Sequence, residues 1–175
     1  CQALAFGQTL RERIPGRPGG PVVFVGDGNN VCSSLMILCA SLGYDFTVAC
    51  APGYEPPPEI IDASRERASH RGAEVAISHD PATAVARASA IYTDVWASMG
   101  QENEAQKRAR DFEGFQINAA MLSGAPADVL VSHCLPAHRG EEITDEVLDS
   151  ARCMAFDEAE NRLHVQKAVI HHLFS

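Results

Sequence analysis

Short apolar runs alternate with amphipathic stretches along most of the chain. Runs rich in β-branched and aromatic residues lie at 21–28, 44–51, 73–78, 89–94 and 128–133, and each has the length of a buried strand. Between them, apolar residues recur at helical spacing, as in "NNVCSSLMILCASLG" from residue 29 and "PPPEIIDASRERASHRG" from residue 56. The pattern therefore predicts strands and helices in alternation.

The remaining segments extend this alternation. Helical patterns are expected at 1–14, 80–88, 102–111, 116–123, 144–150 and 158–174, and a last short strand at "CMAFD", 153–157. Such an order predicts an α/β fold: a doubly wound, mainly parallel, Rossmann-like sheet with helices on both faces. Ligands of these sheets bind beyond the carboxyl ends of the strands, so the loops expected to carry chemistry are 26–31, 51–55, 78–80, 94–100 and 133–140.

Composition narrows the class of protein. The 175 residues suit one domain, and a formal charge of −9 argues against nucleic acid as a partner. No apolar run reaches ~18 residues and no signal pattern opens the chain, so no membrane is expected. Six cysteines without a C-x-x-C pair indicate reduced thiols and a cytoplasmic location. Because the chain begins with Cys1, we expect a processed protein or a fragment of a longer one.

The turn "GDGNN" at 26–30 follows the first predicted strand. A dinucleotide site is a weak interpretation, because the third glycine of G-x-G-x-x-G would fall at Val31 and no acidic residue ends the second strand. A turn that feeds a helix N-terminus suits an anion such as a carboxylate, and Asn30 would add an amide donor there. The alternative is an ordinary glycine turn with an asparagine cap.

The segment "DVWASMG" at 94–100 follows another strand end. Asp94 can pair with a ligand ammonium, and Ser98 and the backbone near Met99 offer further polar contacts. The alternative is that Trp96 and Met99 only pack the loop and that Asp94 caps the next turn.

In "HCLPAHRGEEI", a thiol lies where a buried strand ends. Adjacent strand residues point to opposite faces, so His133 and Cys134 are not expected to form a nucleophile–base pair. A zinc site also lacks a second pair of spaced ligands besides His138. Cys134 is then either a small buried apolar residue or a polar group at a binding loop whose backbone Pro136 holds open.

The segment "FDEAENRLHVQKA" at 156–168 places acidic residues at a helix start, which suits the helix dipole. Arg162 runs against that trend, and its planar guanidinium suits a phosphate or a carbonyl oxygen. The alternative is an i, i+4 pair with Glu158.

Together, these four segments in this order resemble the ornithine carbamoyltransferases over nearly the whole chain. The resemblance implies an enzyme that moves the carbamoyl group of carbamoyl phosphate to the side-chain amine of ornithine, giving citrulline and phosphate, without metal or organic cofactor. It implies that residues 1–175 form the ornithine-binding domain, with 1–15 a remnant of the interdomain helix and the carbamoyl-phosphate domain outside this chain. A homotrimer is expected for the full-length enzyme.

The resemblance also implies site residues. Ornithine would be held by Asn30, Asp94, Ser98 and Met99. Carbamoyl phosphate would be contacted by Gln2, from the family's "HPCQ" motif, and by Cys134, Leu135 and Arg162. The catalytic residues implied are Cys134, Asp94 and Arg162.

The chain departs from the family pattern in two ways. It contains no "STRT"-like phosphate loop, and Phe6-Gly7 stands where the family usually continues "LAD". Rival hypotheses are a nucleotide-binding oxidoreductase domain, a non-catalytic amino-acid-binding module and a carbamoyltransferase for a related amine.

Overall fold

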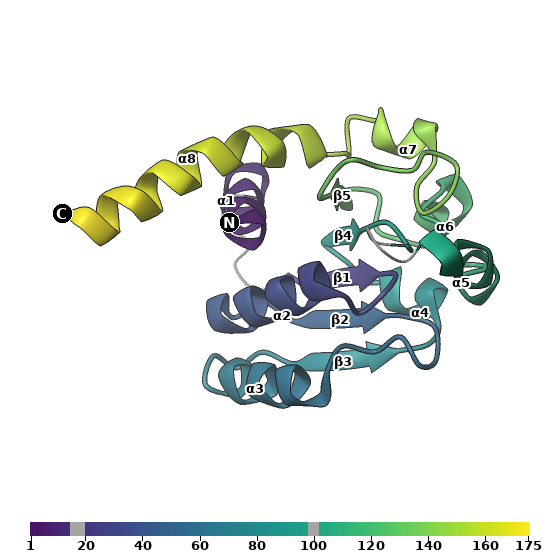
Figure 1. Cartoon of the computed structure of the whole chain (residues 1–175), viewed down its shortest axis with the longest axis horizontal. Helices are drawn as coiled ribbons and strands as arrows, with labels where there is room; N and C mark the ends of the chain where they lie inside the picture. Colours follow the sequence, from purple (N-terminus) through teal and green to yellow (C-terminus); the bar gives the residue numbers. More distant parts are fainter. Residues whose placement is uncertain (15–19, 98–101) are drawn as a thin grey trace.

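The computed structural model describes residues 1–14, 20–97 and 102–175, and its centre is a five-stranded, all-parallel sheet (Figure 1). The strands pair in the order β3-β2-β1-β4-β5, with central residues aligned so that Val22 faces Phe46 on one side and Ala90 on the other. Their bounds are β1 Val22–Val25, β2 Phe46–Ala49, β3 Val75–Ser78, β4 Ala90–Thr93 and β5 Leu130–His133. The predicted doubly wound α/β fold is confirmed.

Helices connect the strands and flank the sheet. The longer helices are α1 Gln2–Arg13, α2 Asn30–Leu42, α3 Pro58–Ser69 and α8 Ala155–Phe174. The shorter ones are α4 Pro81–Val85, η1 Glu102–Glu104, α5 Ala105–Asp111, α6 Ala119–Ser123 and α7 Asp145–Leu148. The chain builds outward from β1 to β3 and then returns to the other side of β1 with β4. The connections after β1 and β4 therefore diverge, and this switch point is where such sheets bind ligands.

Alternation along the strands divides the core into two layers. Phe24 of β1 packs in the layer under α1, α2 and α3, where Phe6 and Tyr92 meet edge to face at 5.0 Å. The next residue along, Val25, packs in the layer formed with α4, α6 and α7, which also contains Phe112. Both faces of each central strand are thus buried, as the continuous apolar runs predicted.

The strand predicted at 153–157 is wrong. Cys153 forms only a single bridge with Val131 of β5, and α8 begins at Ala155, three residues before the predicted helix. The chain turns inward at Met154, whose N–H donates to the Val131 carbonyl at 2.8 Å and whose side chain is fully buried. Its carbonyl already accepts the first bond of the helix, from the Glu158 N–H at 2.9 Å. A five-residue apolar pattern fits one helical turn as well as a strand.

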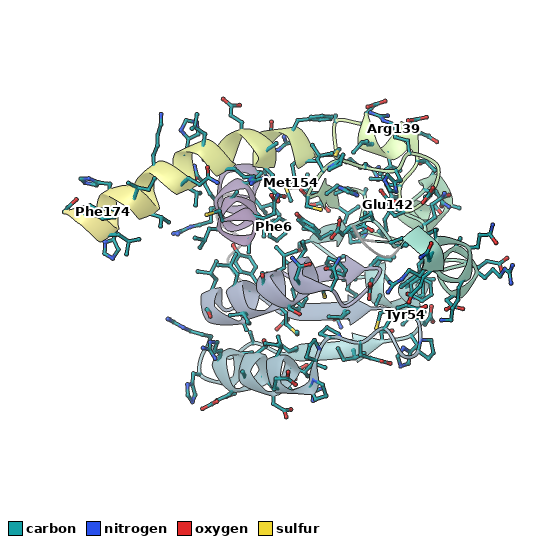
Figure 2. The ribbon with its side chains drawn as sticks, in the orientation of Figure 1. Phe6, Tyr54, Arg139, Glu142, Met154 and Phe174 are labelled. Carbon is teal, nitrogen blue, oxygen red and sulfur yellow. The ribbon has the colours of Figure 1, made fainter. Side chains whose placement is uncertain are left out.

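The C-terminal part of helix α8 extends beyond the rest of the domain. Its first half packs against α1, whereas its last turns extend away from the sheet (Figure 1). Leu173 is 69% exposed and Phe174, at the tip in Figure 2, is 86% exposed. An apolar groove of about 720 Å³ lies between α1, α2 and α8. Among the described helices, none combines the length and apolarity needed to cross a bilayer.

Candidate active site

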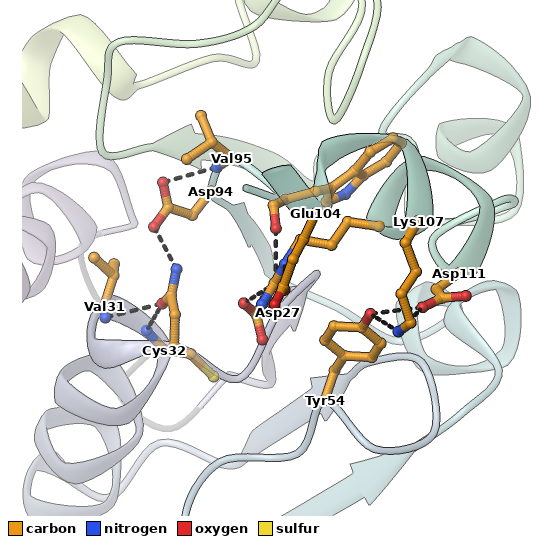
Figure 3. A network of polar contacts seen from close by, with 12 residues as sticks. Asp27, Val31, Cys32, Tyr54, Asp94, Val95, Glu104, Lys107 and Asp111 are labelled. Carbon is orange, nitrogen blue, oxygen red and sulfur yellow. Dashed lines mark hydrogen bonds and ion pairs between the residues drawn. The ribbon is translucent and has the colours of Figure 1, made fainter. Parts of the chain in front are cut away.

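Asp94 lies directly after β4, beside the switch point, and accepts three hydrogen bonds. Its Oδ2 accepts from the side-chain amide of Asn29 at 2.7 Å, and Oδ1 accepts from the Val95 N–H at 2.8 Å (Figure 3). Oδ1 also accepts from the Cys134 thiol at 2.8 Å. The carboxylate is only 6% exposed. Loops that follow β1, β4 and β5 therefore meet at one acidic group, which can accept hydrogen bonds from a ligand ammonium.

Asn29, rather than Asn30, caps α2. Its side-chain oxygen accepts from the backbone N–H groups of Val31 at 2.9 Å and Cys32 at 3.0 Å, and its amide nitrogen is left to bond Asp94. Asn30 is the first helical residue and its side chain is exposed at the same edge of the sheet. Asn29 thus caps α2 and also donates a hydrogen bond to Asp94, while the exposed side chain of Asn30 is accessible to a ligand.

Cys134 is a neutral thiol in this environment. Burial, reinforced by the carboxylate of Asp94, raises the pKa of the Cys134 thiol far above its usual range. A thiol with a raised pKa donates a hydrogen bond rather than acting as a nucleophile. Cys134 is therefore a polar contact group of the site.

His133 is close to the thiol but is engaged elsewhere. Its Nδ1 lies 3.9 Å from Cys134 Sγ, so the expectation that the two side chains simply diverge is incomplete. The same Nδ1 accepts the Leu135 N–H at 2.8 Å, and Nε2 bonds Glu142 at 3.0 Å. Since Nδ1 is an acceptor, the ring proton is on Nε2 and is donated to Glu142. His133 is thus unable to take the thiol proton, which argues against a thiol–histidine pair.

Leu135 has a backbone conformation that L-residues seldom adopt. Its φ is +54°, and a cis peptide bond joins it to Pro136. The left-handed region costs a non-glycine residue roughly 1 kcal/mol, so such residues concentrate at functional sites where the surroundings enforce them. Here the bond from the Leu135 N–H to the buried His133 ring helps to enforce it, and the backbone at 134–135 turns at the edge of the sheet.

A second polar network supports the loop that carries Asp94. Arg108 of α5 is 7% exposed and donates to Asp27 at 2.6 Å and to the Trp96 carbonyl at 2.9 Å (Figure 3). Burial raises the pKa of Asp27, and the Arg108 guanidinium opposes that rise. Trp96 itself stacks on Phe112, with ring centroids 5.7 Å apart, so the tryptophan packs in the core. Arg108 thereby joins the loops after β1 and β4.

The glycine turn after β1 is filled by the protein's own chain. The Gly28 N–H donates to the Tyr54 carbonyl at 2.8 Å, and a Cβ at Gly28 would lie 2.3 Å from the Pro56 nitrogen. Dinucleotide sites use such glycines to let a pyrophosphate approach the backbone. In this turn residues 54–56 make the close approach, which argues against the dinucleotide hypothesis.

Gln2 and Arg162 lie on the two helices that pack together, α1 and α8. The Gln2 amide donates to Glu158, a buried carboxylate of α8. Arg162 is exposed, and its predicted alternative partner Glu158 is instead bonded to Gln2, Tyr92 and Ser132. Ser98 and Met99 lie outside the described residues.

Two groups of metal-type side chains occur among the described residues. In the first, Cys50, Glu55 and His79 bring their ligand atoms within 4.8 Å of one another, and His79 also pairs with Glu55 at 3.5 Å. Burial raises the pKa of the Cys50 thiol to about 12, so metal binding there would have to release the thiol proton. The second group comprises His138, Glu141 and Glu142. Its buried member already accepts from the ring of His133.

Comparison with known proteins decides the family. The model of the aspartate/ornithine carbamoyltransferase Asp/Orn binding domain matches residues 19–173. The chain belongs to the aspartate/ornithine carbamoyltransferase family. It is 49% identical to the ornithine carbamoyltransferase of Methanothermobacter thermautotrophicus over 99% of this chain and 57% of that protein. It is 52% identical to that of Pyrococcus horikoshii over 97% of this chain and 54% of that protein.

Solved structures of the family agree. The ornithine carbamoyltransferase from Pyrococcus furiosus matches with a TM-score of 0.93 and 50% identity, over 97% of this chain and 54% of that chain. The chain thus spans about half the length of the relatives it matches, and the segment it matches includes the carbamoyltransferase family's Asp/Orn binding domain.

Four polar residues of this carbamoyltransferase domain lie at the site without having been predicted for it: Asn29, Arg108, Glu142 and Glu158. Only Glu158 had a usable signal in the sequence. It falls at helical spacing with Ala155, Asn161 and Val165, and all four side chains are buried on one face of α8.

Proposed function

We propose that this chain is the ornithine-binding part of an ornithine carbamoyltransferase, an enzyme of arginine biosynthesis. The observation that carries the proposal is the meeting of Asp94, Cys134 and Asn29 at the switch point of a domain whose family includes that enzyme. Relatives about 50% identical to it bear that name. On this proposal the rest of the enzyme, including its phosphate-binding loop, lies outside these 175 residues.

The reaction requires two separate sets of contacts with ornithine, one at its side-chain amine and one at its amino-acid end. Its side-chain amine, with a pKa near ~10, must lose a proton before the nitrogen can attack the carbamoyl carbon. A carbon–nitrogen bond then forms, the bond from that carbon to the phosphate oxygen breaks, and phosphate departs with the electron pair. The charged amino-acid end must be fixed elsewhere, so that only the far amine reaches the carbonyl.

Different residues of the site provide these two sets of contacts. Asp94 takes the ammonium of the amino-acid end, with Asn30, Ser98 and Met99 as the further contacts that the resemblance implies. Cys134 and the Leu135 backbone stand at the reacting amine, where a neutral thiol serves as a hydrogen-bond partner. The raised pKa of the Cys134 thiol supports this role over covalent catalysis.

Residues of α1 and α8 contact carbamoyl phosphate. Gln2 contacts the carbamoyl group, and the exposed guanidinium of Arg162 contacts the phosphate or the carbamoyl oxygen. Donors of this kind stabilise the negative charge that develops on that oxygen in the transition state. The proposal includes a cytoplasmic homotrimer that needs no cofactor.

The test is Cys134→Ala in the full-length protein, with Cys153→Ala as the matched control. Cys134→Ala should lower kcat at least about tenfold, equivalent to ~1.4 kcal/mol, while an unreactive ornithine analogue binds within about threefold of wild type. Cys153 is a half-buried cysteine in the loop before α8, and its variant should keep wild-type kinetics. Equal kcat in both variants would remove the proposed role of Cys134, and absence of citrulline production by the unaltered protein would remove the proposed function.

A further inference from the structure

Glu158 is a buried carboxylate that joins three other elements. It has no exposed surface, and it accepts from the Tyr92 hydroxyl of β4 at 2.8 Å and from the Ser132 hydroxyl of β5 at 2.5 Å. Its third donor is the side-chain amide of Gln2 at the start of α1. One carboxylate of α8 therefore fixes the first residue of α1 against the sheet.

Three hydrogen-bond donors surround the carboxyl group of Glu158. Burial raises the pKa of Glu158, and the hydrogen bonds from Ser132, Tyr92 and Gln2 oppose that rise. An arrangement in which every neighbour donates suits the ionised form, which is acceptor-only. The carboxylate is thus maintained as a hydrogen-bond acceptor in the interior.

The acceptor oxygen Oε1 of Glu158, which also accepts from Tyr92, decides which end of the Gln2 amide faces inward. A carboxylate can bind only the NH₂ end of a carboxamide, and Nε2 is indeed the atom that contacts Glu158. The carbonyl oxygen of Gln2 is at the other corner of the amide, so the end left for a ligand is an acceptor. Gln2 is half-buried, and an acceptor held in that position favours a ligand that carries an N–H.

The cluster is continuous with the candidate site. Tyr92 of β4 and Ser132 of β5 lie two residues before Asp94 and Cys134, which directly follow the ends of those strands. Cys134 packs against the core layer that contains Tyr92. The charge of Glu158 also contributes to the raised pKa of the Cys134 thiol. Gln2 is therefore anchored, through Glu158, to the two strands whose ends carry Asp94 and Cys134.

We propose that Glu158 is a positioning residue that orients the Gln2 amide, so that its carbonyl oxygen accepts a hydrogen bond from the NH₂ of the carbamoyl group. This orientation makes the protein select carbamoyl phosphate over acetyl phosphate. The methyl group of acetyl phosphate has nearly the same size as the NH₂ group of carbamoyl phosphate but cannot donate a hydrogen bond. The inference rests on the proposed function. Leaving a half-buried acceptor unpaired corresponds to a selectivity of about tenfold to hundredfold.

The experiment measures selectivity in the full-length protein. The readout is the ratio of the inhibition constant of acetyl phosphate to the dissociation constant of carbamoyl phosphate. Gln2→Ala should reduce this ratio about tenfold or more, Glu158→Leu should reduce it nearly as much, and the double variant should match Gln2→Ala alone. A purely structural role of Glu158 would weaken both phosphates equally and leave the ratio unchanged.

Two further variants serve as controls. Tyr92→Phe removes one donor to Glu158 but keeps the bond from Gln2, so the ratio should stay within about twofold of wild type. Glu158→Gln can still accept from Gln2 through its carbonyl oxygen and should also preserve the ratio. If Glu158→Leu fails to fold, Glu158→Asp replaces it, because the shorter side chain withdraws the carboxylate from Gln2 while keeping its charge.

The outcomes separate the two proposals. If Gln2→Ala leaves the ratio unchanged, the contact of Gln2 with the carbamoyl group is wrong, and with it that part of the proposed function. If Gln2→Ala reduces the ratio but Glu158→Leu or Glu158→Asp does not, or if the two effects multiply in the double variant, the positioning role is overturned and the proposed function stands.

Discussion

Removal of the Arg108 side chain should destabilise the domain strongly. Arg108→Met keeps the length of the side chain but leaves Asp27 and the Trp96 carbonyl without their donor (Figure 3). In the Arg108–Asp27 pair the side chains are 8% and 14% exposed. Breaking a buried pair by removing one partner costs roughly 3–5 kcal/mol, and the slight exposure of Asp27 places the expected loss near ~3 kcal/mol. This is a large share of the stability of an ordinary domain.

Urea unfolding of the 175-residue chain measures this loss. With a slope of about 2 kcal/mol per molar urea, the midpoint should fall by about 1.5 M. Trp96 fluorescence and far-ultraviolet circular dichroism should report the same shift, because Trp96 is packed on Phe112 beside Arg108. The matched control is Lys107→Met, which removes a neighbouring cation that is 69% exposed. That variant should shift the midpoint far less, because an exposed ion pair contributes little to stability.

The pH dependence provides a second check on the same variant. Burial already raises the pKa of Asp27, and loss of the Arg108 charge should raise it further. A carboxyl group whose pKa is higher in the folded state stabilises the fold when protonated and loses that contribution as the pH rises. The deficit of Arg108→Met should therefore grow as the pH rises above the ordinary titration range of aspartate, about pH 4. A deficit no larger than that of Lys107→Met, or one that shrinks with rising pH, would refute the reasoning.

Three further changes test the site and its supports. Because the Cys134 pKa is raised, its alkylation by iodoacetamide should keep accelerating above pH 9, and Asp94→Asn should speed it severalfold at pH 8. Peptide mass spectrometry should find Cys153 unaffected; an unchanged rate at Cys134 would contradict the coupling. Asn29→Ala removes the α2 cap and should cost about 1 kcal/mol in urea unfolding, whereas a neutral result would contradict the cap assignment. Gly43→Ala, at φ +82°, should cost about 1–2 kcal/mol, and a gain in stability would contradict the left-handed cap.

The sequence was sufficient for the sheet because both faces of its central strands are buried. Continuous apolar runs predicted all five strands, and parallel order then required the residues after β4 and β5 to lie together. Thr93 is indeed paired with His133, so Asp94 and Cys134 follow neighbouring strand ends and meet at 2.8 Å. A parallel sheet predicts that the two groups lie at the same edge, and the adjacency of β4 and β5 in the structure brings them into contact.

The features that the sequence could not give depend on single conformations or on distant contacts. Two adjacent asparagines compete for the α2 cap, and the extended ψ of −169° at Asn29 decides between them. Arg108 lies in a charged segment that suggests a solvated helix, yet its partner Asp27 is 81 residues away. Glu158 is an acid of the first helical turn, as predicted. The predicted helix begins at Glu158 rather than at Ala155, so the run of buried positions 155, 158, 161 and 165 is incomplete in the prediction.

The projecting end of α8 has a practical consequence for work on this segment alone. Ile170, Leu173 and Phe174 present apolar surface beyond the body of the domain, next to the groove between α1, α2 and α8. Surfaces of this kind drive molecules together at high concentration. Preparations of the isolated segment should therefore elute earlier from a sizing column as they are concentrated, and titrations or unfolding curves are best recorded at several dilutions, so that self-association is not mistaken for ligand binding or intrinsic stability.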